Sequence, residues 1–323
     1  MTSKPTDGTS RWTFLARLQG EPGAADQPEI GLKPCDARRR DHLPGRVTRV
    51  YGHDTSETVE YRFDSCGYRG EEYRSDAKVK ICVIGESHAL GTGVHFEETF
   101  GFRLKAMLAK VMGLQRHDVN LLNFSFGGAS ADYCARTLHR QLQRVSVDFV
   151  VCVVPPQDRI EYKNGSIYNS LVVGSVDVTQ LEKLPSHLLG YCEYYSHEVG
   201  RLNRVKNLLV MQGLMHSRDI EYVFAVENMP KAGEGFGAID PFLSALDEDR
   251  VMRHRFFLPK FDRAADGEHS GPRTHGAFAI QLFHQFGSSL RQRGMTGLAD
   301  LIEADASRLM TEDADYRFCS QAS

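Results

Sequence analysis

The sequence predicts an α/β fold, a three-layer αβα sandwich around a five-stranded parallel sheet with the flavodoxin-like strand order 2-1-3-4-5. Three observations predict the parallel sheet and its two helical layers. Short apolar segments alternate five times with longer segments of helical periodicity. The apolar segments have strand length and lack a polar face, as strands of parallel sheets do. The chain has 323 residues, enough to bury a sheet between two layers of helices.

Runs of β-branched and other apolar residues mark the expected strands, and the first run ends at Gly85. These strands are expected at residues 79–84, 119–123, 149–154, 222–226 and 254–258. Helices are expected where apolar residues recur every three or four positions. These segments are 96–111, 131–145, 197–215, 241–247, 274–293 and 298–309.

The chain is expected to have three parts. Residues 1–75 form an N-terminal extension that is partly irregular, and alternation at 46–50 and 59–63 predicts a β-hairpin in it. Residues 76–295 form the main α/β domain. An insertion at about 160–195 is too long for a simple loop and is expected to carry short elements of its own. Residues 296–323 form a C-terminal helix and a polar tail.

Composition and charge indicate which classes of partner the protein lacks. The net charge of −3 and the pI of about 6.5 argue against nucleic acid as the main partner. The sequence has no apolar run of membrane-helix length and no secretion signal, which predicts a cytoplasmic protein without a membrane partner. Seven widely spaced cysteines without a CxxC pair indicate neither a zinc site nor a disulfide framework. No metal or cofactor is expected, and nothing indicates the oligomeric state.

Polar residues follow the carboxyl ends of the predicted strands, where parallel sheets collect their sites. Ser87 comes directly after the first strand, at a strand-to-helix turn. A serine hydroxyl needs a base to act as a nucleophile, and His269 before the last long helix can be that base. Asp266 precedes His269 by three residues, so one turn can bring its carboxylate to the imidazole and fix the tautomer. The sequence therefore predicts a Ser87–His269–Asp266 triad.

A serine nucleophile also needs hydrogen-bond donors for the oxyanion that develops during acyl transfer. The main-chain amides of Ser87 and Gly128 and the side chain of Gln157 are expected to converge there. Gly128 follows the second strand and Gln157 the third. The absence of a Cβ at Gly128 lets a substrate approach the backbone closely.

The blocks around these residues resemble those of the SGNH, or GDSL-type, hydrolase family. Gly85-Glu86-Ser87 resembles the Gly-Asp-Ser block, Gly128 maps to the oxyanion-hole glycine, and Asp266 with His269 matches Asp-x-x-His. Residues 66–72 and 97–100 resemble the segments that lead into and follow the first block in bacterial members. The resemblance spans about residues 65–290 and implies a serine-dependent hydrolase.

The chain departs from the family pattern at three positions. Glu86 stands where the family has Asp, at a position that shapes the turn. Gln157 stands where the family has an oxyanion-hole Asn, and its extra methylene displaces the amide donor. Ser270 stands where a proline usually follows the histidine. The remaining candidates for substrate binding are Glu86, His88, Arg159 and His275. The alternative for His275 is packing near the start of the last helix, and the alternative for Arg159 is an ion pair with Asp158.

Each candidate also has a purely structural interpretation. Ser87 is at a position where serine often caps a helix, and Asp266 can cap a turn. The two glycines 127–128 can simply permit a tight turn. Because all blocks occur together, we expect an O-acyl esterase or deacetylase that forms an acyl-Ser87 intermediate on a small polar or sugar-like ester. The alternatives are an acyltransferase that uses the same serine and a catalytically impaired binding protein of this fold.

The insertion supplies many tyrosines that suit a wall of the substrate site. They are Tyr162, Tyr168, Tyr191, Tyr194 and Tyr195. Aromatic rings with polar tips suit sugars, and they suit ordinary packing equally well.

Overall fold

The computed structural model of the chain describes residues 48–51, 58–164, 167–173, 186–234, 237–253, 261–292 and 294–312. Its main sheet has five parallel strands in the spatial order β4-β3-β5-β8-β9. Their bounds are β3 (Val79–Ile84), β4 (Val119–Asn123), β5 (Phe149–Val154), β8 (Glu221–Val226) and β9 (Val251–Arg253). Numbered along the chain this order is 2-1-3-4-5, so the predicted fold class and strand order are confirmed.

The fifth strand lies earlier in the chain than expected. β9 occupies Val251–Arg253 and pairs with β8, with Val251 opposite Phe224. The expected strand at 254–258 falls outside the described residues. The segment Val251–Arg253 is too short to give a recognisable strand pattern. The strand was therefore predicted at the more apolar run Phe256-Phe257-Leu258 that follows it.

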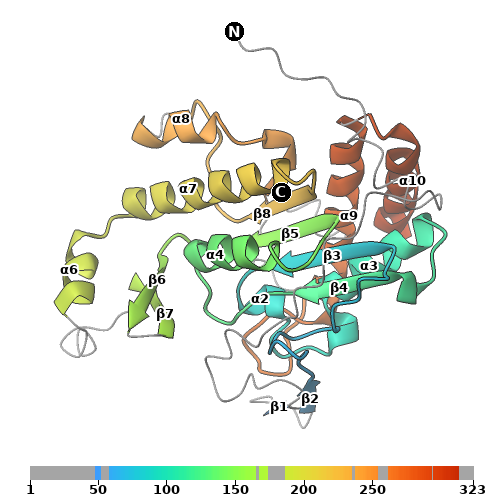
Figure 1. The fold of residues 1–323 in the computed structure, drawn as a ribbon, viewed down its shortest axis with the longest axis horizontal. Helices are drawn as coiled ribbons and strands as arrows, with labels where there is room; N and C mark the ends of the chain where they lie inside the picture. Colours follow the sequence, from blue (N-terminus) through green and yellow to red (C-terminus); the bar gives the residue numbers. More distant parts are fainter. Residues whose placement is uncertain are drawn as a thin grey trace.

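Helices cover both faces of the sheet (Figure 1). One face carries α4 (Ala131–Gln141), α7 (His197–His216) and α8 (Asp240–Leu243), whose buried side chains share one core with the strands. The other face carries α3 (Phe100–Val111), α9 (Pro272–Gln292) and α10 (Thr296–Glu312). None of the helices in the described part of the chain combines the length and apolarity needed to cross a membrane.

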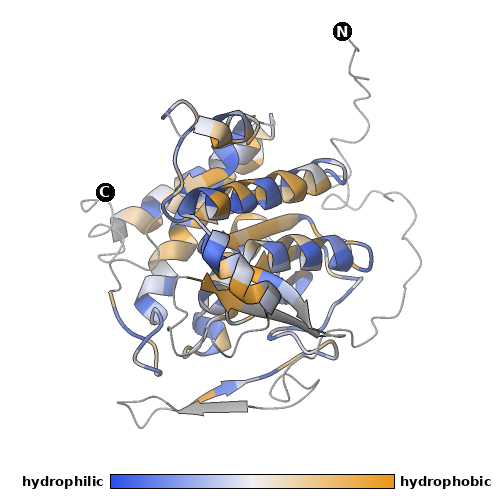
Figure 2. Cartoon of the chain, turned by 90° about the vertical axis from the view of Figure 1, so that its left-hand side faces the viewer, coloured by the Kyte–Doolittle hydropathy of each residue, from blue (hydrophilic) through white to orange (hydrophobic). Residues whose placement is uncertain are grey.

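The side-chain alternation of the strands builds the two cores. Within β3, Cys82 and Ile84 belong to the core beneath α4 and α7, whereas Ile81 and Val83 belong to the core beneath α3 and α9. All six residues of β3 are buried, as expected for a central parallel strand. Figure 2 shows the resulting pattern, in which the strands are hydrophobic and the helices carry hydrophilic residues on their outer faces.

Two small antiparallel sheets accompany the main sheet. In the N-terminal segment, β1 (Thr48–Tyr51) pairs with β2 (Thr58–Tyr61) where the alternation predicts a hairpin. In the insertion, β6 (Arg159–Asn164) pairs with β7 (Ile167–Val172) and is followed by α6 (Ser186–Tyr194). Val59, Tyr61 and Phe63 form a small core with Ala265, so the segment after β1 packs on the loop before α9.

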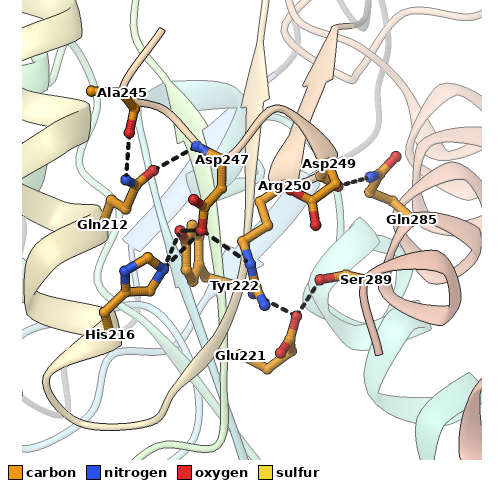
Figure 3. A network of polar contacts seen from close by, with 10 residues as sticks. All are labelled: Gln212, His216, Glu221, Tyr222, Ala245, Asp247, Asp249, Arg250, Gln285 and Ser289. Atoms are coloured by element: carbon orange, nitrogen blue, oxygen red, sulfur yellow. Dashed lines mark hydrogen bonds and ion pairs between the residues drawn. The ribbon is translucent and has the colours of Figure 1, made fainter. Parts of the chain in front are cut away.

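A polar network ties β8 to its neighbours at the amino end of the strand (Figure 3). Arg250 Nη1 donates to Glu221 Oε1 at 2.7 Å, and Ser289 Oγ on α9 donates to the same oxygen at 2.5 Å. The hydroxyl of Tyr222 donates to Asp247 Oδ2 at 2.9 Å. Buried charges need such partners to offset their desolvation. The network therefore fixes the amino end of β8. Ser87 lies at the opposite, carboxyl edge of the sheet.

Gly85 allows the end of β3 to lie against β5. A Cβ at this position would be 2.6 Å from the carbonyl oxygen of Val153 and 2.7 Å from the Cβ of Ala89. We therefore expect Gly85→Ala to lower the free energy of unfolding by about 1–3 kcal/mol, the usual cost of overpacking. Urea unfolding measures this change.

Gly213→Ala is the matched control, because a Cβ there meets no atom within 4 Å and the residue lies on an exposed face of α7. It is expected to raise the free energy of unfolding by about 0.5–1 kcal/mol, the gain from replacing a helical glycine. A Gly85→Ala protein as stable as the wild type would contradict the close packing of β3 on β5.

Candidate active site

Ser87 is the first residue of α2 (Ser87–Leu90), a short helix that begins directly after β3 and Gly85. The N-cap of this helix is Glu86, whose Oε1 accepts from the main-chain N–H of His88 at 3.1 Å. The capping interpretation of Ser87 therefore does not hold, because the neighbouring carboxylate performs that role. The hydroxyl of Ser87, which is partly exposed, is left for other contacts.

The three residues of the predicted triad meet at the carboxyl edge of the sheet. Ser87 Oγ lies 2.9 Å from His269 Nε2, and His269 Nδ1 lies 2.5 Å from Asp266 Oδ2. The ion pair is largely sheltered, with 21% of the His269 side chain and 13% of the Asp266 side chain exposed. Because an ionised carboxylate only accepts hydrogen bonds, it places the imidazole proton on Nδ1 and leaves Nε2 able to take up the Ser87 proton during reaction.

Asp266 is held as an anion by its own turn. Burial by itself would raise the pKa of this carboxyl. The main-chain N–H groups of His269 and Glu268, each donating to Oδ1 at 3.0 Å, and the His269 side chain outweigh that effect and hold the pKa below its ordinary value. The carboxylate is thus charged at neutral pH, as a partner that orients an imidazole must be.

Hydrogen bonds fix the loop that carries Asp266 and His269. Ala264 N–H donates to the carbonyl of His269 at 2.9 Å and closes the turn on itself. Ala265 N–H donates at 2.9 Å to the carbonyl of Gly93, a residue that follows α2. The loop is therefore joined directly to the segment that contains Ser87.

The N-terminal segment supports the same region through Tyr61 and Arg69, for which no functional role was predicted. The hydroxyl of Tyr61 accepts from the N–H of Gly93 at 2.6 Å. Arg69, only 1% exposed, donates to the carbonyls of Leu90 and Gly91 and, at 2.6 Å, to that of Val94. The buried guanidinium thereby ties down the chain that leaves α2. Arg69 lies in the 66–72 segment that resembles the family's lead-in. That resemblance was the only sequence feature that could have pointed to this residue.

The three predicted oxyanion donors have different surroundings. Gly128 has a φ of +76° in a turn closed by the Ala129 N–H, which donates to Phe126 O at 3.0 Å. Within the described residues, the N–H of Gly128 donates to no acceptor. The amide of Ser87 lies at a helix start, where N–H groups lack helical partners. Gln157 Nε2 lies 3.3 Å from His197 Nδ1 at the start of α7.

Three of the four residues suggested for substrate binding surround the triad. Glu86 is 2% exposed, and its Oε2 accepts from Ser87 Oγ at 2.6 Å and from Arg159 Nη1 at 3.3 Å. The ring of His88 lies 4.9 Å from the ring of His269, centroid to centroid. Arg159 is the first residue of β6, so the insertion contributes directly to this edge of the sheet.

His275 lies in the core and does not contact substrate, contrary to its place among the substrate-binding candidates. Its side chain is buried, with 1% of the residue exposed, so a substrate cannot reach it. Nδ1 accepts from the main-chain N–H of Phe100 at 3.2 Å, and the imidazole stacks on the Phe100 ring. Burial, aided by nearby His88 and Arg103, lowers the pKa of His275 to about 3. The residue is therefore a neutral part of the core between α3 and α9.

This burial predicts a pH-dependent contribution to stability. Between pH 6.5 and about 3, the unfolded chain protonates His275 and the folded chain does not, so the free energy of unfolding falls on acidification. One such group contributes about 1.4 kcal/mol per pH unit. His275→Asn keeps an acceptor for Phe100 N–H and removes this contribution. We expect its stability deficit, measured by urea unfolding, to shrink from pH 7 to pH 5; an equal deficit at both pH values would contradict the neutral core histidine.

No model of a known protein family matches the sequence, and no curated protein matches it. Solved structures similar to the chain include esterases and G-D-S-L lipolytic proteins. The psychrotrophic esterase EstA from Pseudoalteromonas sp. has 13% identity and a TM-score of 0.39 over 66% of this chain and 97% of its own.

Two further similar structures have comparable values. The acetyl xylan esterase AlAXEase has 13% identity and a TM-score of 0.36 over 64% of this chain and 98% of its own. A lipolytic G-D-S-L protein from Veillonella parvula has 10% identity and a TM-score of 0.33 over 63% and 97%. A G-D-S-L protein, the class that the sequence blocks resemble, is thus among the solved structures similar to this chain.

No group of three or more His, Cys, Asp or Glu side chains in the described part of the chain is arranged to hold a metal ion. The chemistry available at the carboxyl edge is that of a hydroxyl, an imidazole and carboxylates. This set suits acyl transfer through oxygen.

Proposed function

We propose that the protein is a serine-dependent ester hydrolase that works through an acyl-Ser87 intermediate. The observation that carries the proposal is the continuous contact from Ser87 Oγ through His269 to Asp266, at 2.9 Å and 2.5 Å. In acylation, Ser87 Oγ bonds to the acyl carbon, His269 takes its proton, and the leaving alcohol departs with that proton. Water then repeats the sequence and releases the acid.

The proposed oxyanion hole consists of the amides of Ser87 and Gly128 and the side chain of Gln157. Two observations support it. The N–H of Gly128 donates to no acceptor in the described part of the chain, and a Cβ there would meet no atom within 4 Å. A Gln side chain has two amide N–H donors, so Gln157 can contact His197 and keep one donor for the oxyanion.

The proposed substrate is a small polar or sugar-like ester. Its support is the aromatic insertion next to the strand-end residues. A Cβ at Gly200 would be 2.4 Å from the Tyr195 hydroxyl and 2.6 Å from the Gln157 carbonyl, so the tyrosine and the segment after β5 lie together. The rings of Tyr191 and Tyr195 are 6.2 Å apart. Tyrosines present both a flat apolar face and a polar tip, which suits sugar rings.

Activity on p-nitrophenyl acetate and on acetylated sugars tests the proposal. Wild type should release acetate, and Ser217→Ala, which changes an exposed serine at the far end of α7, should do the same. Addition of a sugar alcohol as acceptor separates hydrolysis from acyl transfer, because a transferase would form the acetylated sugar instead of acetate. A folded wild-type protein that turns over no ester would refute the proposal.

A further inference from the structure

The hydroxyl of Ser87 has one proton and two acceptors. His269 Nε2 is 2.9 Å from Ser87 Oγ, and Glu86 Oε2 is closer, at 2.6 Å. A hydroxyl donates one hydrogen bond, so the proton can lie on only one of these contacts at a time. Acylation needs it on the His269 side. The contact of Ser87 with Glu86 therefore plays no part in the proton transfer to His269.

The two oxygens of Glu86 face different partners. Oε1 accepts from the His88 N–H and caps α2, while Oε2 faces Ser87 Oγ and Arg159. A cap needs only the first oxygen. The Glu86 side chain is 3% exposed, so little water can replace a lost partner, and the Arg159 guanidinium at 3.3 Å supplies the balancing charge. The second oxygen, Oε2, therefore accepts the hydrogen bond of the nucleophile itself.

We infer that Glu86 destabilises the acyl-Ser87 intermediate and so speeds its breakdown; this rests on the function proposed above. In the free enzyme, Ser87 O–H donates to the Glu86 carboxylate. In acylation the Oγ–acyl bond forms, the ester bond breaks, and the proton leaves with the alcohol. Oγ then has no hydrogen, and the buried carboxylate faces an ester oxygen. Water attack returns a proton to Oγ and restores the hydrogen bond.

The charged hydrogen bond is thus present before acylation, absent in the intermediate and present again after deacylation. Hydrogen bonds to charged groups are among the stronger ones, and a buried group that loses its partner is costly. Deacylation should be accelerated by about ten- to a hundredfold, the range that one such bond spans. The wild type is accordingly limited by acylation and accumulates little acyl-enzyme.

Glu86→Gln reverses this preference without removing the cap. The amide oxygen can accept from His88 N–H, and the amide nitrogen puts a donor against Oγ that stabilises the acyl ester. When deacylation alone is slowed, kcat and KM fall together and kcat/KM is preserved. With p-nitrophenyl acetate we expect a nitrophenol burst and acetyl-Ser87 in quenched samples, kcat and KM each lowered about tenfold, and kcat/KM within about threefold of the wild type.

Glu161→Gln is the matched control, because Glu161 is also a sheltered carboxylate with an arginine partner, Arg136 at 2.7 Å. It should show no burst. Glu86→Asp keeps the cap and the charge but withdraws the carboxylate by one methylene, so it should show a smaller burst and serves if Glu86→Gln does not fold. A burst-free Glu86→Gln, or a fall in kcat at unchanged KM, would overturn the inference. Failure of the wild type itself to acylate Ser87 would instead overturn the proposed function.

Discussion

Ser87→Ala is expected to lower kcat/KM for ester hydrolysis by about 10³–10⁶-fold, the range found when a serine nucleophile is removed and donors alone remain. The reason is that Ser87 Oγ is the one hydroxyl in contact with His269 Nε2 among the described residues. Steady-state kinetics on p-nitrophenyl acetate measures the effect, with thermal melting to show that the fold is retained.

The loss should be specific to this position. Ser217→Ala, at an exposed site near the amino end of β8, should keep wild-type kinetics. Glu86 retains Arg159 as a partner in the Ser87→Ala protein, so the variant should melt close to the wild type. A Ser87→Ala enzyme with more than about a tenth of wild-type kcat/KM would mean that another group performs the chemistry, since nucleophile losses are far larger.

Asp266→Asn is expected to lower kcat by about 10⁴-fold, as when such a carboxylate is replaced by an amide and the imidazole takes the wrong tautomer. The amide oxygen can still accept from the main-chain N–H groups of Glu268 and His269, so the turn should persist. Its nitrogen, however, would donate to His269 Nδ1 and force the imidazole proton onto Nε2. That nitrogen could then no longer accept from Ser87.

Glu268→Gln is the control for this variant, because it makes the same change of carboxylate to amide on an exposed side chain in the same turn. It should retain near wild-type kcat. Circular dichroism of both variants shows whether the fold persists. If Asp266→Asn kept wild-type kcat, the orienting role of Asp266 would be wrong even with Ser87 as nucleophile.

The main sheet could be predicted because its strands are apolar on both faces. β3 and β5 are uninterrupted apolar runs, and the helices between them show clear periodicity. β9 itself was not predicted, because its three residues carry little pattern. The predicted strand order 2-1-3-4-5 is a common one in doubly wound sheets, and the structure confirms it.

The triad of the candidate site could be predicted because its residues lie at positions defined by the predicted strands and helices. Ser87, Asp266 and His269 occupy strand ends and a turn before the last long helix, positions that the fold brings together. His275 could not be placed by spacing, since only packing shows that it stacks on Phe100 inside the core. The contact of Glu86 with Ser87 depends on a side-chain rotamer, and no sequence pattern specifies it.

The most direct test of an activated Ser87 is labelling with a fluorophosphonate probe, followed by peptide mass spectrometry. A single adduct on Ser87 is expected, absent in Ser87→Ala and much slower to form in His269→Ala, because a serine hydroxyl needs its base to attack. An intact, folded wild-type protein that takes up no label on Ser87 would contradict the nucleophile assignment, and with it the proposed ester hydrolase.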